Sequence, residues 1–170
     1  MPTGLIFLIQ MILGYVAWLL CFGTYGLPWL GPMDPVQVQR AIATLHSFRF
    51  FGLAFLVPGV VGPALPAGFA PAAALGDFAT GLLALAALLA VRIPPLFWVL
   101  VVAFNLVGIG DFLLDYWHAV RGGLPEHAGA LGAAYAIPVL YVPLLMITHG
   151  YALYRLARPR AAASGRTVRP

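Results

Sequence analysis

The stretch that decides the fold is Asn105-Leu-Val-Gly-Ile-Gly-Asp111-Phe-Leu-Leu-Asp115-Tyr-Trp-His118, a series of polar residues within an otherwise apolar segment. A carboxylate at the centre of a transmembrane helix costs about 3 kcal/mol on insertion scales. On a helix, Asp111, Asp115 and His118 lie at positions i, i+4 and i+7 and therefore share one face. The pattern predicts that this face is turned toward protein or water rather than toward lipid.

The composition places the chain among integral membrane proteins. Of its 170 residues, 62% are hydrophobic and only 8% are charged. Soluble domains carry about 25% charged residues, and spanning β-strands would need segments of about ten residues with alternating polarity. The apolar runs here are continuous and much longer, so the predicted fold class is an all-α integral membrane bundle.

Turn residues and charges divide the apolar sequence into segments. Asp34 followed by Pro35 predicts a helix start, with an N-cap acceptor before a proline in the first turn. The expected organisation is a five-helix transmembrane domain at 1–156, with spans at about 5–27, 41–61, 71–91, 95–120 and 131–156, and a disordered, arginine-rich cytoplasmic tail at 157–170.

The arginines predict the orientation. The chain has nine arginines and no lysine, and a five-span arrangement puts seven of them on one side, one on the other and Arg49 within a span. Positive charge concentrates on the cytoplasmic side, so the N-terminus is expected outside and the C-terminus inside. Because most of the charge lies in the tail, we expect a membrane-lipid partner rather than nucleic acid.

One candidate site is a cluster of polar residues at membrane depth. It consists of Arg49, Asp77, Asn105, Asp111 and Asp115 on three of the predicted spans. A guanidinium and a carboxylate that meet inside the bilayer satisfy each other, which favours a structural ion pair that fixes helix register. The other hypothesis is a functional one, in which the acids serve ion, proton or small-solute transport or bind a ligand.

His46 and His149 form the second candidate site, because they are expected at similar depth on two different spans. Two such histidines could ligate the iron of haem b, or another metal. They could equally be neutral residues that bond to the neighbouring Ser47 and Thr148. The single Cys21 excludes an internal disulfide and a CxxCH haem attachment site.

Three parts of the sequence resemble a family of small, uncharacterised bacterial membrane proteins. They are the stretch His46-Ser-Phe-Arg49-Phe-Phe-Gly52 with the residues up to Val61, Phe104-Asn105 with Asp111, and Tyr135 through Thr148-His149-Gly150. The resemblance covers about residues 40–156. It implies a multi-pass protein of the bacterial inner membrane with the five-span bundle, and it implies no activity.

The functional hypotheses follow from these residues. No phosphate-binding glycine loop, nucleophile elbow or HExxH motif is present, which favours a non-catalytic protein without deciding whether it is an enzyme. The main hypothesis is transport or ligand binding through the Arg/Asp/Asn cluster. The alternatives are a structural or accessory membrane subunit and a bis-histidine haem b protein. A homo-oligomer or a protein partner is left open.

Overall fold

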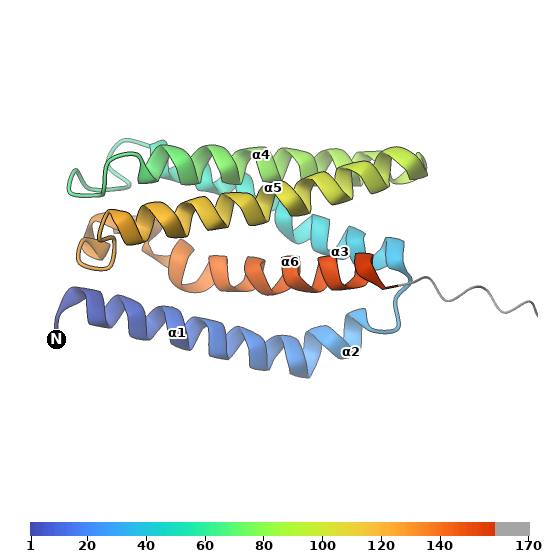
Figure 1. Ribbon diagram of the computed structural model, residues 1–170, viewed down its shortest axis with the longest axis horizontal. Coiled ribbons are helices and arrows are strands. Elements are labelled where there is room, and N and C mark those ends of the chain that lie inside the picture. The colour runs from blue at the N-terminus through green and yellow to red at the C-terminus, as the bar shows by residue number, and fades with distance from the viewer. Residues whose placement is uncertain (159–170) are drawn as a thin grey trace, which may run out of the picture.

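The computed structural model describes residues 1–158, and in this part of the chain all regular elements are helical. The long helices run side by side along the length of an elongated bundle (Figure 1). Here η marks a 3₁₀- or π-helical segment. In chain order the elements are α1 (Thr3–Cys21), η1 (Phe22–Gly26), α2 (Leu27–Leu30), α3 (Pro35–Ser47), η2 (Phe48–Leu56), α4 (Phe69–Leu89), η3 (Ala90–Arg92), α5 (Pro94–Arg121), η4 (Ala128–Tyr135), η5 (Ile137–Tyr141) and α6 (Val142–Ala157).

Four of the helices are long and apolar enough to cross a membrane, which indicates a membrane protein. They cover Thr3–Leu30, Phe69–Arg92, Pro94–Arg121 and Ile137–Ala157. The segment expected to cross at 41–61 is not among these four. It consists of α3 followed by η2, and the chain leaves the helix after Leu56.

Proline accounts for the π-helical turns in two of these helices. The segment η1 precedes Pro28, and η5 precedes Pro143. A proline has no backbone N–H and its ring clashes with the carbonyl four residues earlier, so a wider turn at that point relieves the conflict. The helix then continues instead of breaking.

The start of α3 agrees with the sequence expectation. The Asp34 carboxylate accepts a hydrogen bond from the Gln37 backbone N–H at 3.0 Å, and the Gln37 side chain accepts one from the Asp34 N–H at 3.4 Å. These two bonds form a capping box, which satisfies two donors at the helix start.

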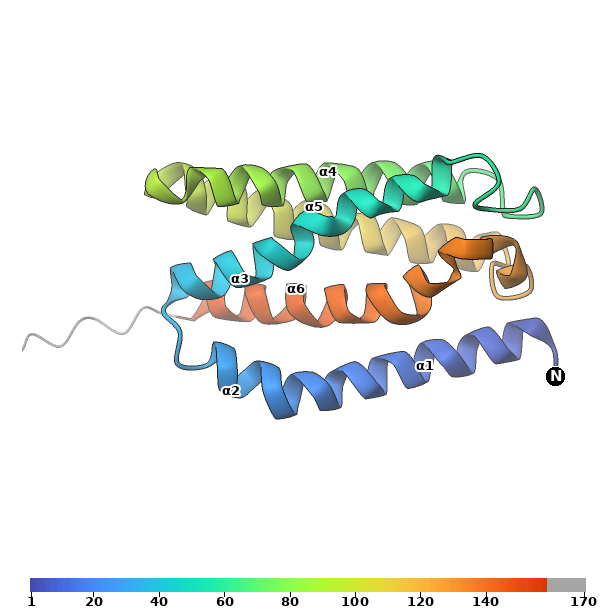
Figure 2. The same ribbon diagram turned by 180° about the vertical axis from the view of Figure 1, so that it is seen from behind.

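The change from α3 to the 3₁₀ segment η2 determines which residues face the bundle. In a 3₁₀-helix, residues three apart lie directly above one another. Arg49, Gly52 and Phe55 follow this spacing and are all buried, whereas the neighbouring Phe48 and Phe51 are exposed. Figure 2 shows η2 continuing from α3 along the bundle beside α4. The 3₁₀ segment therefore points Arg49 at α4 and α5.

Two apolar cores lie at opposite ends of the bundle, and polar residues lie between them. On α4, Ala73 and Ala74 belong to one core and Ala84 and Ala87 to the other, with Asp77 between the pairs. The same order holds on α3–η2, on α5 and on the final helix, where the buried polar residues between the two cores include His46, Arg49, Asn105, Asp111, Thr148 and His149. The polar layer thus crosses the middle of the bundle.

The last helix differs from the expected span at 131–156. Residues 128–135 form the 3₁₀ segment η4, which is kinked at Gly132 with a φ of 53°. A positive φ is accessible to glycine at low cost, and it redirects the chain here. The spanning helix therefore begins at Ile137. The tail expected at 157–170 lies almost wholly outside the described residues, since Ala157 ends α6 and the description stops at residue 158.

Candidate functional site

Arg49 is the centre of a buried polar network. Its side chain is 0% exposed. Its Nε donates to Asp77 Oδ1 at 2.6 Å, its Nη2 donates to Asp111 Oδ2, and its Nη1 donates to His149 Nε2 at 3.2 Å. The guanidinium carbon lies 4.1 Å from the centroid of the Phe112 ring. The planar guanidinium of Arg49 therefore joins η2 to α4, α5 and α6, and each of its three nitrogens has a partner.

The hydrogen bonds of His149 define its tautomer. Arginine can only donate, so His149 Nε2 acts as the acceptor in the bond with Arg49. A neutral imidazole has one N–H, which therefore lies on Nδ1 and donates to Asn105 Oδ1 at 2.9 Å. The Asn105 amide in turn donates to the Val101 carbonyl at 2.9 Å. Four of the five residues in the predicted cluster thus belong to one network, and His149 connects Asn105 to it.

The ring of His46 packs against that of His149, with 3.9 Å between the ring centroids. His46 Nε2 bonds to Thr148 Oγ1 at 3.0 Å, whereas the Ser47 hydroxyl donates to the Thr44 carbonyl at 2.8 Å. Axial haem ligands lie on opposite sides of an iron, and here no gap separates the two rings. Within residues 1–158, no group of three or more His, Cys, Asp or Glu side chains is placed to hold a metal ion.

Asp115, the fifth residue of the predicted cluster, is separate from the network. It lies one turn beyond Asp111 on α5. Its Oδ1 is buried and has no hydrogen-bond partner among residues 1–158. An unpaired carboxylate oxygen in such surroundings is costly, and within residues 1–158 this is the buried side-chain atom of the cluster that has no partner.

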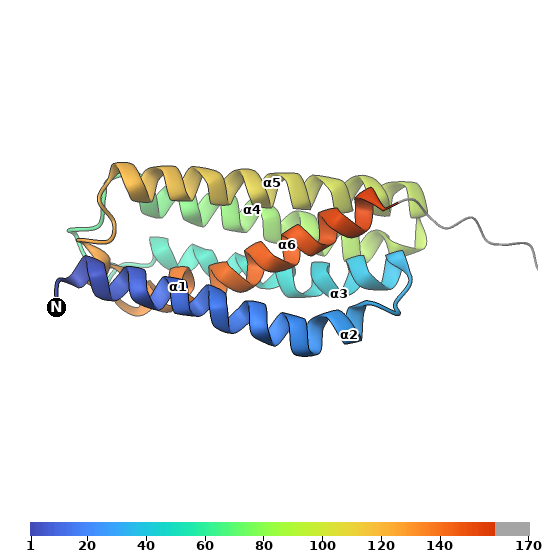
Figure 3. The same cartoon turned by 60° about the horizontal axis from the view of Figure 1, so that its bottom comes forward.

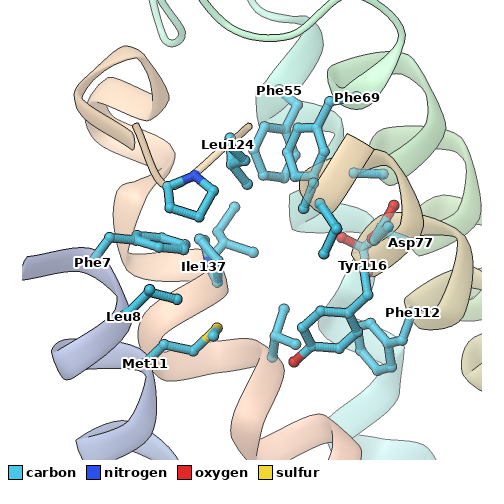
Figure 4. A pocket seen from close by; sticks show the side chains of 17 residues that line it. Phe7, Leu8, Met11, Phe55, Phe69, Asp77, Phe112, Tyr116, Leu124 and Ile137 are labelled. Carbon is cyan, nitrogen blue, oxygen red and sulfur yellow. The ribbon is translucent and has the colours of Figure 1, made fainter. Parts of the chain in front are cut away.

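A cavity of about 120 Å³ lies beside this carboxylate. In Figure 4, Phe7, Leu8 and Met11 of α1 face Asp77, Phe112 and Tyr116 across an open space. Most of the wall is apolar, and its polar groups are Asp77, Asp115 and Tyr116. The full lining is Phe7, Leu8, Met11, Phe55, Phe69, Ala73, Asp77, Phe112, Asp115, Tyr116, Ala119, Val120, Leu124, Pro125, Ile137, Pro138 and Val142.

The helix α1 closes one side of the cavity and is loosely attached. In its most apolar 18 residues only 11% are buried, against 39% in the other three candidate spans. Figure 3 shows α1 along the edge of the bundle beside α6. Hydrogen bonds at its side chains include Tyr15 Oη to Tyr116 Oη at 2.5 Å and Trp18 Nε1 to the Leu140 carbonyl at 2.8 Å. The Tyr15–Tyr116 bond connects α1 to α5 next to the cavity.

Several residues of the site were not part of the sequence expectation. Phe112 covers the guanidinium of Arg49, and Tyr15 and Tyr116 join two helices that are far apart in the sequence. The spacing of Arg49, Gly52 and Phe55 was the signal available for the 3₁₀ face. Nothing local in the sequence indicated the cavity, because its lining comes from six separate helical elements and one loop.

The fold and the site define a helical membrane protein with a charged network buried between its helices. Residues 6–157 match the family model described as "Domain of unknown function (DUF8737)", and the chain belongs to this family. No curated protein and no solved structure matches the chain. The resemblance to an uncharacterised family without an assigned activity is thereby confirmed.

Proposed function

We propose that α3 and η2 together form a fifth crossing, with the N-terminus outside and the C-terminus inside a bacterial inner membrane. The two segments have 13 and 9 residues. At helical rises of about 1.5 and 2.0 Å per residue they span roughly 37 Å, more than the ~30 Å of a bilayer core. The lower hydropathy of α3 comes in part from polar residues that face the protein interior, such as Gln39 and His46, and the polar residue of η2, Arg49, also faces the interior. Arg92 and Arg155 then lie at the end expected inside and Arg121 at the other.

Within that membrane, we infer that the protein binds a small molecule in the cavity beside Asp77 and Asp115. The observation that carries this inference is that Asp115, whose buried Oδ1 has no partner among the described residues, lines an apolar cavity. Protein interiors are close-packed, and a mostly apolar cavity with a few converging polar groups is typical of a ligand site. The Arg49 network supports the site because it holds Asp77 in a fixed orientation.

A cavity-filling substitution tests this function. Ala119 lines the cavity, whereas Ala79 is exposed on the outer face of α4. Native mass spectrometry of the protein released from mild detergent should show a bound small molecule in the wild type and in Ala79→Phe. In Ala119→Phe that molecule should be lost while the protein stays folded. An equal occupancy in both variants would contradict ligand binding in this cavity.

A second candidate function is ion or proton transport, which is favoured by an excess of acids. Asp77 and Asp111 share a single guanidinium and Asp115 lies one turn beyond Asp111, so protons or a cation would balance part of the acidic charge. Transport predicts a flux in proteoliposomes that Asp111→Asn abolishes while the folded protein remains. A flux that is the same for wild type, variant and empty liposomes would remove this candidate.

The arrangement of His46 and His149 favours a protein without haem b. Both nitrogens of His149 are already bonded, and the two rings pack directly on each other. We expect no Soret band in protein expressed with haem supplementation. A Soret band that disappears in His46→Ala would instead support the haem alternative.

A further inference from the structure

We propose that the ligand of this cavity is a cationic amphiphile, namely a small apolar molecule that carries one protonated amine. This inference rests on the proposed binding function and specifies its ligand class. It follows from the charges at the cavity wall, from the position of Arg49 and from the size of the space.

The cavity wall carries acidic but no basic side chains. Asp77 and Asp115 contribute to the lining, and no Arg, Lys or His is among the lining residues of the described chain. An anionic ligand would meet two acidic side chains and no basic side chain at the wall. The electrostatics of the wall therefore disfavour a carboxylate, sulfate or phosphate as the polar group.

Arg49 cannot reverse this preference, although it lies close to Asp77. Its three guanidinium nitrogens are bonded to Asp77, Asp111 and His149, and the ring of Phe112 covers one face. With 0% of the side chain exposed, the guanidinium offers no donor to the cavity. The cavity is therefore lined by Asp77 and Asp115 but not by Arg49, the cation that partly balances their charge.

A protonated amine can donate hydrogen bonds to the carboxylate of Asp115, whose Oδ1 the fold leaves without a partner among the described residues. An ammonium has three N–H donors, and a charge-assisted bond to a carboxylate is roughly twice as strong as a neutral one. Asp115 lines the cavity, and its buried Oδ1 lacks a partner within the described residues. A cation at this point also reduces the excess of acids over Arg49. A neutral alcohol could bond to Asp115, but it would leave the charge uncompensated.

The remaining surface specifies the apolar part of the ligand. Aliphatic side chains and four phenyl rings form it, those of Phe7, Phe55, Phe69 and Phe112. The volume of about 120 Å³ is comparable to an engineered protein cavity of about 150 Å³ that binds benzene. A six-membered ring on a short chain therefore matches the space, and such a molecule can reach the cavity from the bilayer beside the loosely attached α1.

Three probes of similar shape and different charge test the ligand class. They are 2-phenylethylamine, 2-phenylethanol and 3-phenylpropionate, each titrated at neutral pH into the full-length protein in nanodiscs, with binding followed by ligand-observed NMR. Empty nanodiscs correct for partition into lipid. We expect the amine to bind about tenfold more tightly than the alcohol, and the anion to show no binding above the lipid background.

Two substitutions connect the preference to the carboxylate. Asp115 makes no hydrogen bond through Oδ1, so Asp115→Asn should keep the fold and lower amine affinity to that of the alcohol. The matched control is Glu126→Gln, which removes an exposed carboxylate near the same end of α5 and outside the cavity lining. It should leave all three affinities unchanged.

The possible failures are distinguishable. If the alcohol or the anion binds at least as tightly as the amine, the ligand class is wrong and the binding function stands. If the amine preference persists in Asp115→Asn, the assignment to this carboxylate is wrong. If none of the three probes binds, or if binding persists in the cavity-filling Ala119→Phe, both the ligand class and the proposed function are contradicted.

Discussion

Arg49 is fully buried and Asp115 is half-buried in the same bundle, and their surroundings differ completely. Every guanidinium nitrogen of Arg49 has a partner, and those partners come from three other helices. Asp115 lines a cavity, and its buried Oδ1 has no partner within the described residues. Since unpaired polar groups are costly, the comparison supports a structural role for Arg49 and the proposed binding role for Asp115.

The largest expected effect is on Arg49. Arg49→Met should lower the free energy of unfolding by about 3–5 kcal/mol, because it leaves Asp77 and Asp111 buried without a cation. Unfolding in mixed micelles with increasing denaturing detergent measures this loss. Arg40→Met, at an exposed position on α3, is the control and should change stability by less than about 0.5 kcal/mol. Equal losses in the two variants would contradict the central role of Arg49.

A smaller loss of stability is expected from substituting the two histidines. His149 bonds to Arg49 and Asn105 of the network, whereas His46 bonds to Thr148. His149→Phe should cost about 2 kcal/mol because it removes the partner of Arg49 Nη1 and of Asn105 Oδ1. His46→Phe removes only the bond to Thr148, so its loss should be about 1 kcal/mol or less. The same unfolding assay compares them, and a larger loss at His46 would show that the network is assigned incorrectly.

Alanine substitutions at two glycines test the close packing of α4 against α5 independently of helix propensity. A methyl group at Gly76 would meet the Asp111 side chain, whereas one at Gly110 would meet no atom within 4 Å. Gly76→Ala should therefore destabilise the protein by about 1–3 kcal/mol. Gly110→Ala should stabilise it by up to about 1 kcal/mol, because alanine is the better helix former. If both substitutions have the same sign, the close approach of α4 and α5 at Asp111 is not as described.

The smallest effect on stability is expected at Asp115. Asp115→Asn should change the free energy of unfolding by no more than about 0.5 kcal/mol, since Oδ1 of this carboxylate has no partner to lose. Asp111→Asn, one turn away and bonded to Arg49, is the matched variant and should be clearly destabilised. A loss at Asp115 as large as that at Asp111 would place Asp115 in the structural network.

Much of this arrangement could be predicted from the sequence. The lack of charge indicated a helical membrane protein, and Asp34-Pro35 marked the start of α3 correctly. The cost of charge in lipid predicted that Arg49 would meet an acid, and it meets both Asp77 and Asp111. The two predictions about charge succeeded because each depends on the cost of moving a charged side chain from water into lipid. The helix start depends on the capping preference of Asp34 followed by Pro35.

Other features depend on three-dimensional packing. The change to a 3₁₀-helix at Phe48 rotates Arg49 into the interior, and the kink at Gly132 delays the start of the last helix to Ile137. The separation of Asp115 from Asp111 results from which neighbours reach each carboxylate, although the two are one helical turn apart. Periodicity places residues on a common face but does not say how that face is divided between a network and a cavity.

The most direct test of the central claim measures the unfolding temperature with and without 2-phenylethylamine for the wild type and for Asp115→Asn, both reconstituted in nanodiscs. A ligand that binds only the folded state raises the unfolding temperature. We predict that the two proteins unfold at the same temperature without the amine and that the amine stabilises the wild type alone. Equal stabilisation of both proteins, or of neither, would contradict the assignment of Asp115 as the ligand-binding carboxylate.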